Sequence, residues 1–231
     1  MYGTNLVHDL QPYDEQRNLR VVVETPRGAN IKIKFDDKLG CFSLSRVLPL
    51  GVTYPYDFGF VPQTLAQDGD PIDAVVLIDA MTYPGVVISC RLLGALQVEE
   101  RGLRGRPNHR LVAVPVKAAR RDDWRNFSDL GKRMQQELER FFVMSSAFTS
   151  KDPVVRGWVG PDAANDMVQR SISRYRERQV RPSSEIPSHA AVAVMSESLT
   201  ISVTGSEPTA EPAAEPRDEA QPRPEPTDKA E

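Results

Sequence analysis

The sequence predicts an α+β fold: a closed or highly curled, OB-like, antiparallel β-barrel with two flanking helices on its C-terminal side. Three observations predict this class. Short segments with strand periodicity follow one another with turn residues between them, helical patterns come only after these segments, and the C-terminal part becomes rich in Pro and Glu. Strands first and helices afterwards are typical of α+β domains.

The strands are predicted from β-branched residues and period-2 alternation. In the segment 30–35 the alternation places Lys32 and Lys34 together on the polar face. The turn 36–40, with two aspartates and a glycine, then predicts a hairpin. The full set of expected strands is residues 19–24, 30–35, 41–48, 74–78, 86–99 and 111–116.

Two helices are expected after the strands. Ser128 can cap the first, because a stripe of apolar residues follows it at helical spacing. Pro161 and Asp162 open the second. The stripes consist of Leu130, Met134, Leu138, Phe141 and Phe142 in the first helix, and of Ala164, Val168, Ile172 and Tyr175 in the second.

The 231 residues are expected to form three parts. Residues 1–18 are an extended lead-in, residues 19–179 the folded domain, and residues 180–231 a disordered acidic tail. Between residues 206 and 231 the tail holds eight acidic and three basic side chains and repeats acid–proline pairs. Such a segment cannot bury enough apolar surface to offset the entropy of ordering it.

Bulk properties exclude several classes of protein. The net charge of −3 indicates neither a nucleic-acid nor a membrane partner, although residues 1–205 carry about +2 and suit an anionic ligand. Cys41 and Cys90 lie in apolar surroundings and are expected to be buried thiols in a reducing compartment. No apolar segment approaches the length of a membrane span or a signal peptide core, so we expect a cytoplasmic protein.

Three aspartates, Asp68, Asp70 and Asp73, stand within six residues, directly before the apolar run 74–78. An Asp-Gly-Asp-Pro turn accounts for the first two. Asp73 abuts a strand expected to be buried, where a charge needs a partner. Several carboxylates in a short loop suit Mg²⁺ or Mn²⁺. An EF-hand is excluded, because Asp73 stands where that loop needs Gly.

This loop and the upstream YPYDFGF resemble the signature of the soluble family I inorganic pyrophosphatases. The resemblance extends over roughly residues 19–178, because further segments follow in the family's order: VVVETP, IKIKF, LSRVLPLGVTYPYDFGF, PGVVISCRLLGAL, HRLVAVPV, ERFF and GWVGPDAA. It implies a hydrolase that splits pyrophosphate with several Mg²⁺ ions, for which Mn²⁺ or Zn²⁺ are possible substitutes. It also implies a homo-oligomer, typically a hexamer in bacteria.

The resemblance implies roles for individual residues. The metal ligands are expected to be Asp68, Asp70, Asp73, Glu100 and Glu24. Asp70 is also expected to orient or deprotonate the attacking water. The phosphate-binding residues are expected to be Lys32, Arg46, Tyr54 and Arg110, the first three acting with Asp70 in catalysis. Taken singly, Glu24 and Lys32 would be solvated strand charges, Arg46 a surface arginine and Tyr54 a core aromatic.

The sequence departs from the family at the predicted site. Lys34 stands where the family has an acid, and Phe58 replaces a tyrosine. In the loop before LVAVP, Glu100 replaces an aspartate on a longer stem, while Arg101 and Asn108 replace acids. The Tyr-Lys phosphate clamp of the family aligns with Ser145 and Ser146, and Lys151 is a candidate to reach back into the site.

These departures leave three functions open. Mg²⁺-dependent pyrophosphate hydrolysis, with weakened activity, is the first, because each lost charge-assisted contact is worth about 1.5–3 kcal/mol. A catalytically silenced homologue that serves as a metal- or phosphate-binding scaffold is the second. A barrel that binds nucleic acid is the third, and it is suggested by Lys32, Lys34 and the arginines at 101, 104, 106 and 110. The exposed stacking aromatics of nucleic-acid-binding grooves are missing, so no nucleic-acid partner is expected.

Overall fold

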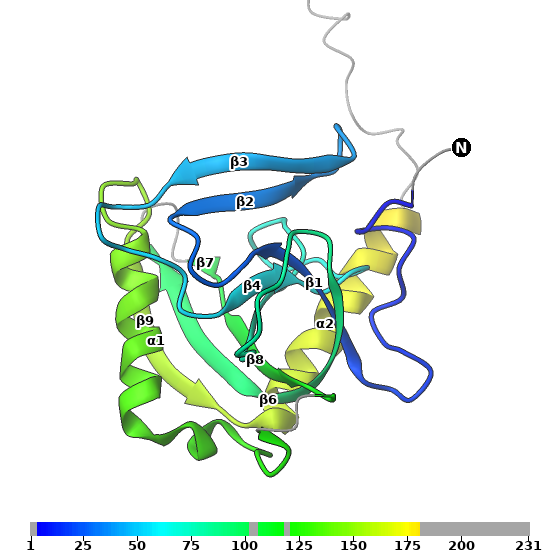
Figure 1. Ribbon diagram of the computed structural model, residues 1–231. Helices are drawn as coiled ribbons and strands as arrows, with labels where there is room; N and C mark the ends of the chain where they lie inside the picture. Colours follow the sequence, from blue (N-terminus) through cyan, green and yellow to red (C-terminus); the bar gives the residue numbers. More distant parts are fainter. Residues whose placement is uncertain (1–3, 102–105, 118–120, 181–231) are drawn as a thin grey trace, which may run out of the picture. The chain divides into compact units, whose positions relative to one another are not determined.

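The computed structural model describes residues 4–101, 106–117 and 121–180 (Figure 1). The chain divides into two units, residues 1–182 and 183–231. Everything described below belongs to the first unit. The predicted tail lies outside the described residues except for Val180, and Arg104 of the predicted basic loop lies outside them as well.

Five strands form a ring of hydrogen-bonded neighbours, because the first strand pairs again with the last. Their order is β1 (Leu19–Thr25), β4 (Asp57–Phe60), β5 (Asp73–Val76), β8 (Arg110–Pro115) and β6 (Val87–Glu100). The β5–β8 pair is parallel, with Val75 opposite Val112, so the prediction of an antiparallel sheet is wrong for this pair. The chain leaves β5, runs along β6 and returns on β8, a long crossover of the kind that parallel pairing requires.

Strand β6 holds the sheet together. It pairs with β1 and β8, and beyond the ring with β7 (Arg106–Pro107) and β9 (Pro153–Val159). Gly94 allows β6 to pair with β8 on one side and with β9 on the other. Its φ is 153°, and a Cβ at this position would lie 2.3 Å from the carbonyl oxygen of Val159. Only glycine allows the strand to bend between two such close neighbours.

Strands β2 (Ile31–Asp36) and β3 (Cys41–Val47) form a separate two-stranded ribbon, joined by the predicted hairpin turn. The carboxylate of Asp36 accepts the N–H groups of Lys38 and Leu39, each at 3.0 Å. Lys32 lies opposite Arg46 in the register, which places the two basic side chains on the same face. Cys41, predicted to be buried, is exposed because it lies at the outer end of this ribbon, whereas Cys90 is buried.

The helices are a short 3₁₀ turn, η3 (Phe127–Leu130), then α1 (Gly131–Ser145) and α2 (Pro161–Val180). The prediction that Ser128 caps the first helix is wrong. Ser128 lies inside η3, whose cap is Asn126: its side chain accepts the Ser128 N–H at 3.2 Å, while Asp129 accepts the Asn126 N–H at 2.8 Å. Helix α1 follows directly, with Leu130 at its N-cap and no side-chain cap. The second helix begins at Pro161, as predicted.

Each long helix covers one part of the sheet (Figure 1). Its predicted apolar stripe joins a core cluster, except for Tyr175, which stacks against His8 instead. Leu138, Phe141 and Phe142 of α1 join a core cluster with residues of β4, β6 and β8. The small stripe of α2, including Ala164 and Val168, packs in a second cluster. Each large side chain buried in this way contributes about 1.5–3 kcal/mol. None of the described helices is both long and apolar enough to cross a membrane.

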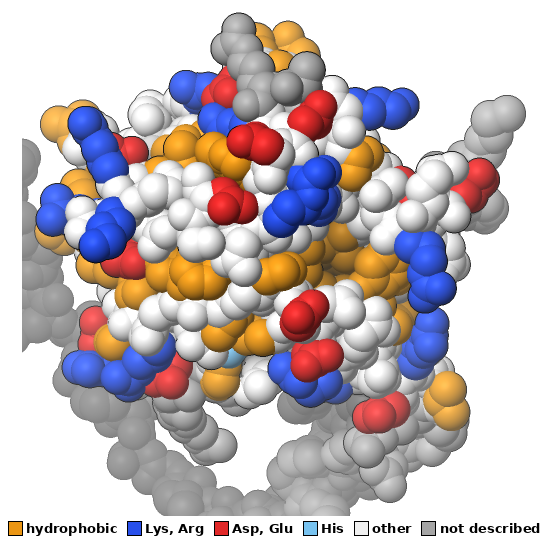
Figure 2. All heavy atoms as spheres, turned by 90° about the horizontal axis from the view of Figure 1, so that it is seen from below, with side chains coloured by type: hydrophobic (Ala, Val, Ile, Leu, Met, Phe, Trp, Pro, Cys, Tyr) orange, Lys and Arg blue, Asp and Glu red, His pale blue; other side chains and the backbone are white. Residues whose placement is uncertain are grey.

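Hydrophobic side chains form a band across the face that Figure 2 shows, and acidic and basic side chains lie on both sides of it. Among the described residues on this face, the blue Lys and Arg side chains alternate with red Asp and Glu. A continuous basic stripe is the usual electrostatic footprint of a nucleic-acid surface. This face does not carry one within the described residues.

Candidate active site

A pocket of about 250 Å³ opens between the β2–β3 ribbon, the ring of strands and the C-terminal end of α1. Residues from all three regions line it, and they include five of the predicted site residues: Lys32, Arg46, Tyr54, Glu100 and Arg110. A neighbouring pocket of about 820 Å³ contains Glu24, Asp70 and Asp73 and shares Lys34 with the first. The fold therefore gathers side chains that are far apart in the sequence around one polar space.

The floor of the first pocket is aromatic. The Lys32 ammonium lies 5.3 Å from the centre of the Phe58 ring, and the Arg110 guanidinium lies 5.9 Å from it. Arg110 also lies 5.6 Å from the Phe142 ring. Such cation–π contacts favour the charged form of the side chains even when they are partly removed from water. Phe58 lacks the hydroxyl of the family tyrosine, but it supports two of the predicted phosphate-binding cations.

Two of the predicted phosphate-binding residues, Arg46 and Arg110, have unused hydrogen-bond donors. The Nε atoms of Arg46 and Arg110 are buried and have no hydrogen-bond partner among the described residues. Buried donors in folded proteins are nearly always paired, so an orphaned donor calls for a partner from outside the chain. Guanidinium groups bind carboxylate and phosphate oxygens with high geometric specificity. The pocket is therefore suited to an oxyanion.

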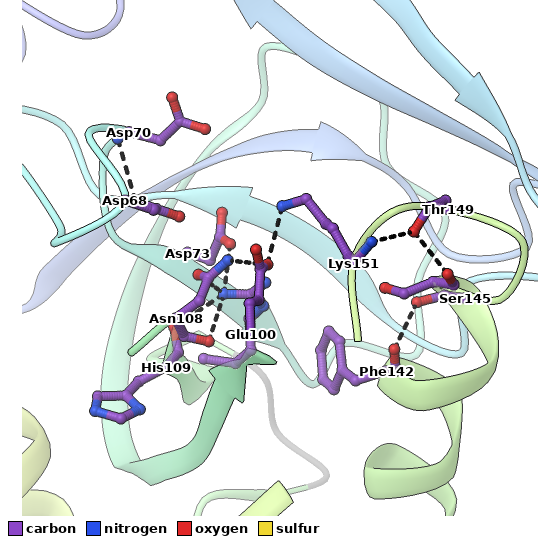
Figure 3. Close-up of polar contacts among 12 residues, drawn as sticks. Asp68, Asp70, Asp73, Glu100, Asn108, His109, Phe142, Ser145, Thr149 and Lys151 are labelled. Atoms are coloured by element: carbon purple, nitrogen blue, oxygen red, sulfur yellow. Dashed lines mark hydrogen bonds and ion pairs between the residues drawn. The ribbon is translucent and has the colours of Figure 1, made fainter. Parts of the chain in front are cut away.

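Three of the predicted metal ligands are each paired with a cation. Figure 3 shows one of these pairs, in which Lys151 reaches Glu100. Asp73 contacts Arg110 at 2.8 Å in a largely buried ion pair. The other two pairs are more exposed: Asp70 contacts Lys34 at 2.6 Å, and Glu100 contacts Lys151 at 2.9 Å.

Asp68, like Glu24, makes no ion pair with any described residue. It accepts only the backbone N–H of Asp70, at 3.2 Å. Burial and the negative charge of Asp73 raise the pKa of the Asp68 carboxyl above its usual value. Figure 3 shows Asp68 beside Asp73. A cation between the two would relieve both causes of the raised pKa.

Within the described residues, no group of three or more His, Cys, Asp and Glu side chains converges as a ready-made metal site. The five predicted ligands are thus not brought together as one cage. Mg²⁺ does not need such a cage, since it keeps several waters and uses one or two carboxylates together with substrate phosphates. Asp68 and Asp73 fit this mode of binding.

Glu24 has a structural contact that the sequence does not reveal. Its carboxylate accepts the N–H of Phe35 at 2.8 Å and so links β1 to the β2–β3 ribbon. Burial raises the pKa of Glu24 to about 7. Tyr54 is also buried, with its ring 4.9 Å from that of Phe141, and burial raises the pKa of its hydroxyl.

Burial also acts on the basic side of the pocket. It lowers the pKa of Lys32 to about 8, and the nearby Asp73 opposes this shift. A bound anion would raise this pKa again, because it stabilises the charged ammonium.

Asn108, which stands where the family has an acid, connects two site residues. Its side-chain amide donates to Glu100 at 2.7 Å, and its carbonyl oxygens, backbone and side chain, accept from the guanidinium of Arg110. Ser145 does not replace the family clamp, because its hydroxyl donates to the backbone carbonyl of Phe142 at 3.2 Å. Lys151 does reach the pocket, where it contacts Glu100.

One buried carboxylate was missed by the sequence reasoning. Asp57 is fully buried, and it accepts the Thr82 hydroxyl at 2.6 Å and the Arg27 N–H at 2.8 Å. These bonds fix loops at the end of β4, outside both pockets. The only signal was a charge inside the apolar YPYDFGF segment.

Fold and site together define an α+β protein with a basic oxyanion pocket beside a row of carboxylates. The family model described as inorganic pyrophosphatase matches residues 21–176. This chain therefore belongs to the inorganic pyrophosphatase family, as the sequence motifs predict.

Known relatives agree with this assignment. The inorganic pyrophosphatase of Synechocystis sp. is 36% identical over 158 residues, which cover 68% of this chain and 92% of the relative. That of Geobacillus stearothermophilus is 34% identical over 165 residues, 71% of this chain and 98% of the relative. The crystal structure of inorganic pyrophosphatase from Thermus thermophilus is similar with a TM-score of 0.70 and 35% identity, covering 75% of this chain and 99% of that chain.

Proposed function

We propose that this chain hydrolyses inorganic pyrophosphate to two phosphates with the help of Mg²⁺. One observation carries the proposal: Arg46 and Arg110, whose buried Nε donors have no partner among the described residues, line a small pocket beside Lys32 in a member of this family. The relatives described above are named inorganic pyrophosphatases.

The basic residues bind the substrate. Lys32, Arg46 and Arg110 contact the phosphate oxygens, and the Tyr54 hydroxyl, whose raised pKa keeps it protonated, donates a further hydrogen bond. Phe58 and Phe142 keep water away from these contacts, which makes each charge more effective. Donors fixed in advance around developing charge are a principal source of catalysis in phosphoryl transfer.

The aspartates hold the metal and the water. Asp68 and Asp73 are the ligands of the first Mg²⁺, while Asp70, Glu100 and Glu24 are outer members of the proposed set. When bound, Mg²⁺ supplies positive charge to the phosphate oxygens and acidifies water. Asp70 orients the attacking water or accepts its proton. Burial raises the pKa of Asp70, but the hydrogen bond and charge of Lys34 outweigh this effect and lower it, so the carboxylate is ionised.

Several finer features complete the proposal on the basis of the family resemblance. The ring of five strands is an OB-like barrel, Mn²⁺ or Zn²⁺ can substitute for Mg²⁺, and the protein acts in the cytoplasm as a homo-oligomer, by resemblance a hexamer. The large exposed side chains of Val47, Leu50 and Phe148 support an oligomer, because unpartnered apolar surface often marks an interface.

A second candidate is a catalytically silenced homologue that binds metal or phosphate as a scaffold. Two observations favour it: the end of α1 offers Ser145 and Ser146 in place of a charged clamp, and Asp73 is already neutralised by Arg110. In this case the pocket would bind pyrophosphate without splitting it.

Phosphate release from pyrophosphate by the purified chain distinguishes the two candidates. Wild type should release phosphate with Mg²⁺, and Asp70→Asn should be strongly reduced. Asp166→Asn makes the same chemical change on the exposed face of α2 and should match wild type. If wild type and Asp70→Asn are equally inactive with Mg²⁺, Mn²⁺ and Zn²⁺, hydrolysis is excluded and the scaffold remains.

A further inference from the structure

We propose that Lys34 and Lys151 are built-in cations that take the place of divalent ions at Asp70 and Glu100. Asp70 and Glu100 then bind no divalent ion tightly in the substrate-free chain, and Asp68 is the aspartate of the loop that remains open to one. The inference rests on the proposed function, since it specifies how many ions the same site uses.

Lys34 is held in position by the backbone around it. The N–H of Ile33 donates to the Thr25 hydroxyl at 3.0 Å, and the N–H of Phe35 donates to Glu24 at 2.8 Å. Both bonds fix β2 over β1, and the alternation of the strand then points Lys34 to the same face as Lys32. From there its ammonium reaches Asp70 at 2.6 Å. The register of the ribbon therefore places the Lys34 ammonium at Asp70.

Lys151 is held in a comparable way. Glu100 lies opposite Pro153 in the β6–β9 register, and the N–H of Arg101 donates to the carbonyl oxygen of Asp152 at 3.0 Å. These two contacts bring the segment before β9 next to the end of β6. The Lys151 ammonium then lies 2.9 Å from Glu100, whose oxygen also accepts from the Asn108 amide. One oxygen of Glu100 is therefore engaged by two donors.

A fixed ammonium competes with a divalent ion in two ways. It occupies the carboxylate oxygen that the ion would need, and its charge repels an ion that approaches the neighbouring oxygen. Affinity for Mg²⁺ and Mn²⁺ depends on the number of free carboxylates and on their net charge. At Asp70 and Glu100, both the number of free carboxylates and their net negative charge are reduced.

The same argument applies to Asp73, because Arg110 engages its Oδ2 atom at 2.8 Å. Asp68 makes no ion pair with any described side chain and lies beside Asp73 (Figure 3). Asp68 is therefore the aspartate of this loop that is most open to a divalent ion, which would keep most of its waters there.

Counting bound Mn²⁺ by electron paramagnetic resonance, without pyrophosphate, tests this inference. Wild type should bind at most one tight Mn²⁺ per chain, and Asp68→Asn should remove that ion. Lys34→Glu should bind one more tight ion than wild type. Lys34→Met and Lys151→Met should bind the next, weaker ion at least about tenfold more tightly than wild type, since each loses a repelling charge. Lys132→Met, which removes an exposed lysine on α1, should match wild type.

Two results would overturn the inference: two or more tight Mn²⁺ ions in wild type, or lysine variants of the site that bind as Lys132→Met does. If Lys34→Glu does not fold, the wild-type count and the two methionine variants still decide. Hydrolysis is measured in parallel. A wild type that is active with two tight ions refutes the inference and leaves the proposed function standing. A wild type that is inactive and binds one ion refutes the proposed function and leaves the inference standing.

Discussion

Arg110 performs two tasks that one substitution can separate. Its Nη1 atom is 2.8 Å from Asp73, in a pair whose side chains are only 10% and 13% exposed, while its Nε atom is buried and unpaired. Lysine can keep the ion pair with its ammonium, but it has a methylene group in place of the Nε–H and so no donor at that position for a phosphate oxygen. Arg110→Lys should therefore reduce activity and spare stability.

The size of both effects follows from the contacts. One charge-assisted hydrogen bond lost in the transition state is worth about 1.5–3 kcal/mol, so kcat/KM should fall roughly ten- to hundredfold in Arg110→Lys. Arg110→Met instead leaves Asp73 buried without a partner, which should lower the free energy of unfolding by about 3–5 kcal/mol.

The assay combines phosphate release with urea unfolding for both variants. Arg133→Lys is the matched control, because Arg133 pairs with Glu137 on the exposed face of α1. Wild-type kcat/KM in Arg110→Lys, with normal stability, would refute the role of the Nε donor. An unchanged stability in Arg110→Met would refute the buried ion pair.

Three further predictions concern the fold. Gly94→Ala should lower the free energy of unfolding by at least about 2 kcal/mol, since the added Cβ would lie 2.3 Å from the Val159 carbonyl oxygen. In the same thermal scan, the control Gly160→Ala should change the free energy of unfolding little. Leu138→Ala should cost about 2–5 kcal/mol in urea unfolding, because Leu138 is almost fully buried, and a loss under 1 kcal/mol would contradict the packing described here. Burial raises the pKa of Glu24 from 4.5 to about 7, so the folded chain holds this proton more tightly and stability falls as the pH rises through this window. In EDTA, Glu24→Gln should therefore be more stable than wild type above pH 7, by up to about 3 kcal/mol, and this difference in stability should vanish near pH 4.5. A stability difference that does not depend on pH would show that Glu24 is not the group responsible.

Local sequence patterns predict strands best where one face is buried and the other is polar. The segment 30–35 has this alternation in its sequence and forms β2, although all six residues of the strand are half-buried in the structure. Strand β4 was not predicted because it is four residues long, buried on both faces and interrupted by Gly59, whose Cβ would lie 1.9 Å from the Val22 carbonyl oxygen. The direction of pairing is also absent from local periodicity, which explains the missed parallel β5–β8 pair.

The site was predictable in its residue types but not in its pairings. The motif order identifies the family and so the three aspartates of the loop 68–73. The partners of these side chains come from distant segments: Lys34 is 36 residues from Asp70, and Lys151 is 51 residues from Glu100. Only the register of β2 and the pairing of β9 with β6 bring each lysine to its carboxylate.

The central claim is that the pocket splits pyrophosphate, and ³¹P NMR of pyrophosphate with purified protein and Mg²⁺ tests it most directly. We predict that the pyrophosphate signal is replaced by inorganic phosphate with wild type, and far more slowly with Asp70→Asn. A pyrophosphate signal that persists with wild type, while the same sample shows bound pyrophosphate and bound metal, would contradict the claim and identify the chain as a binding scaffold.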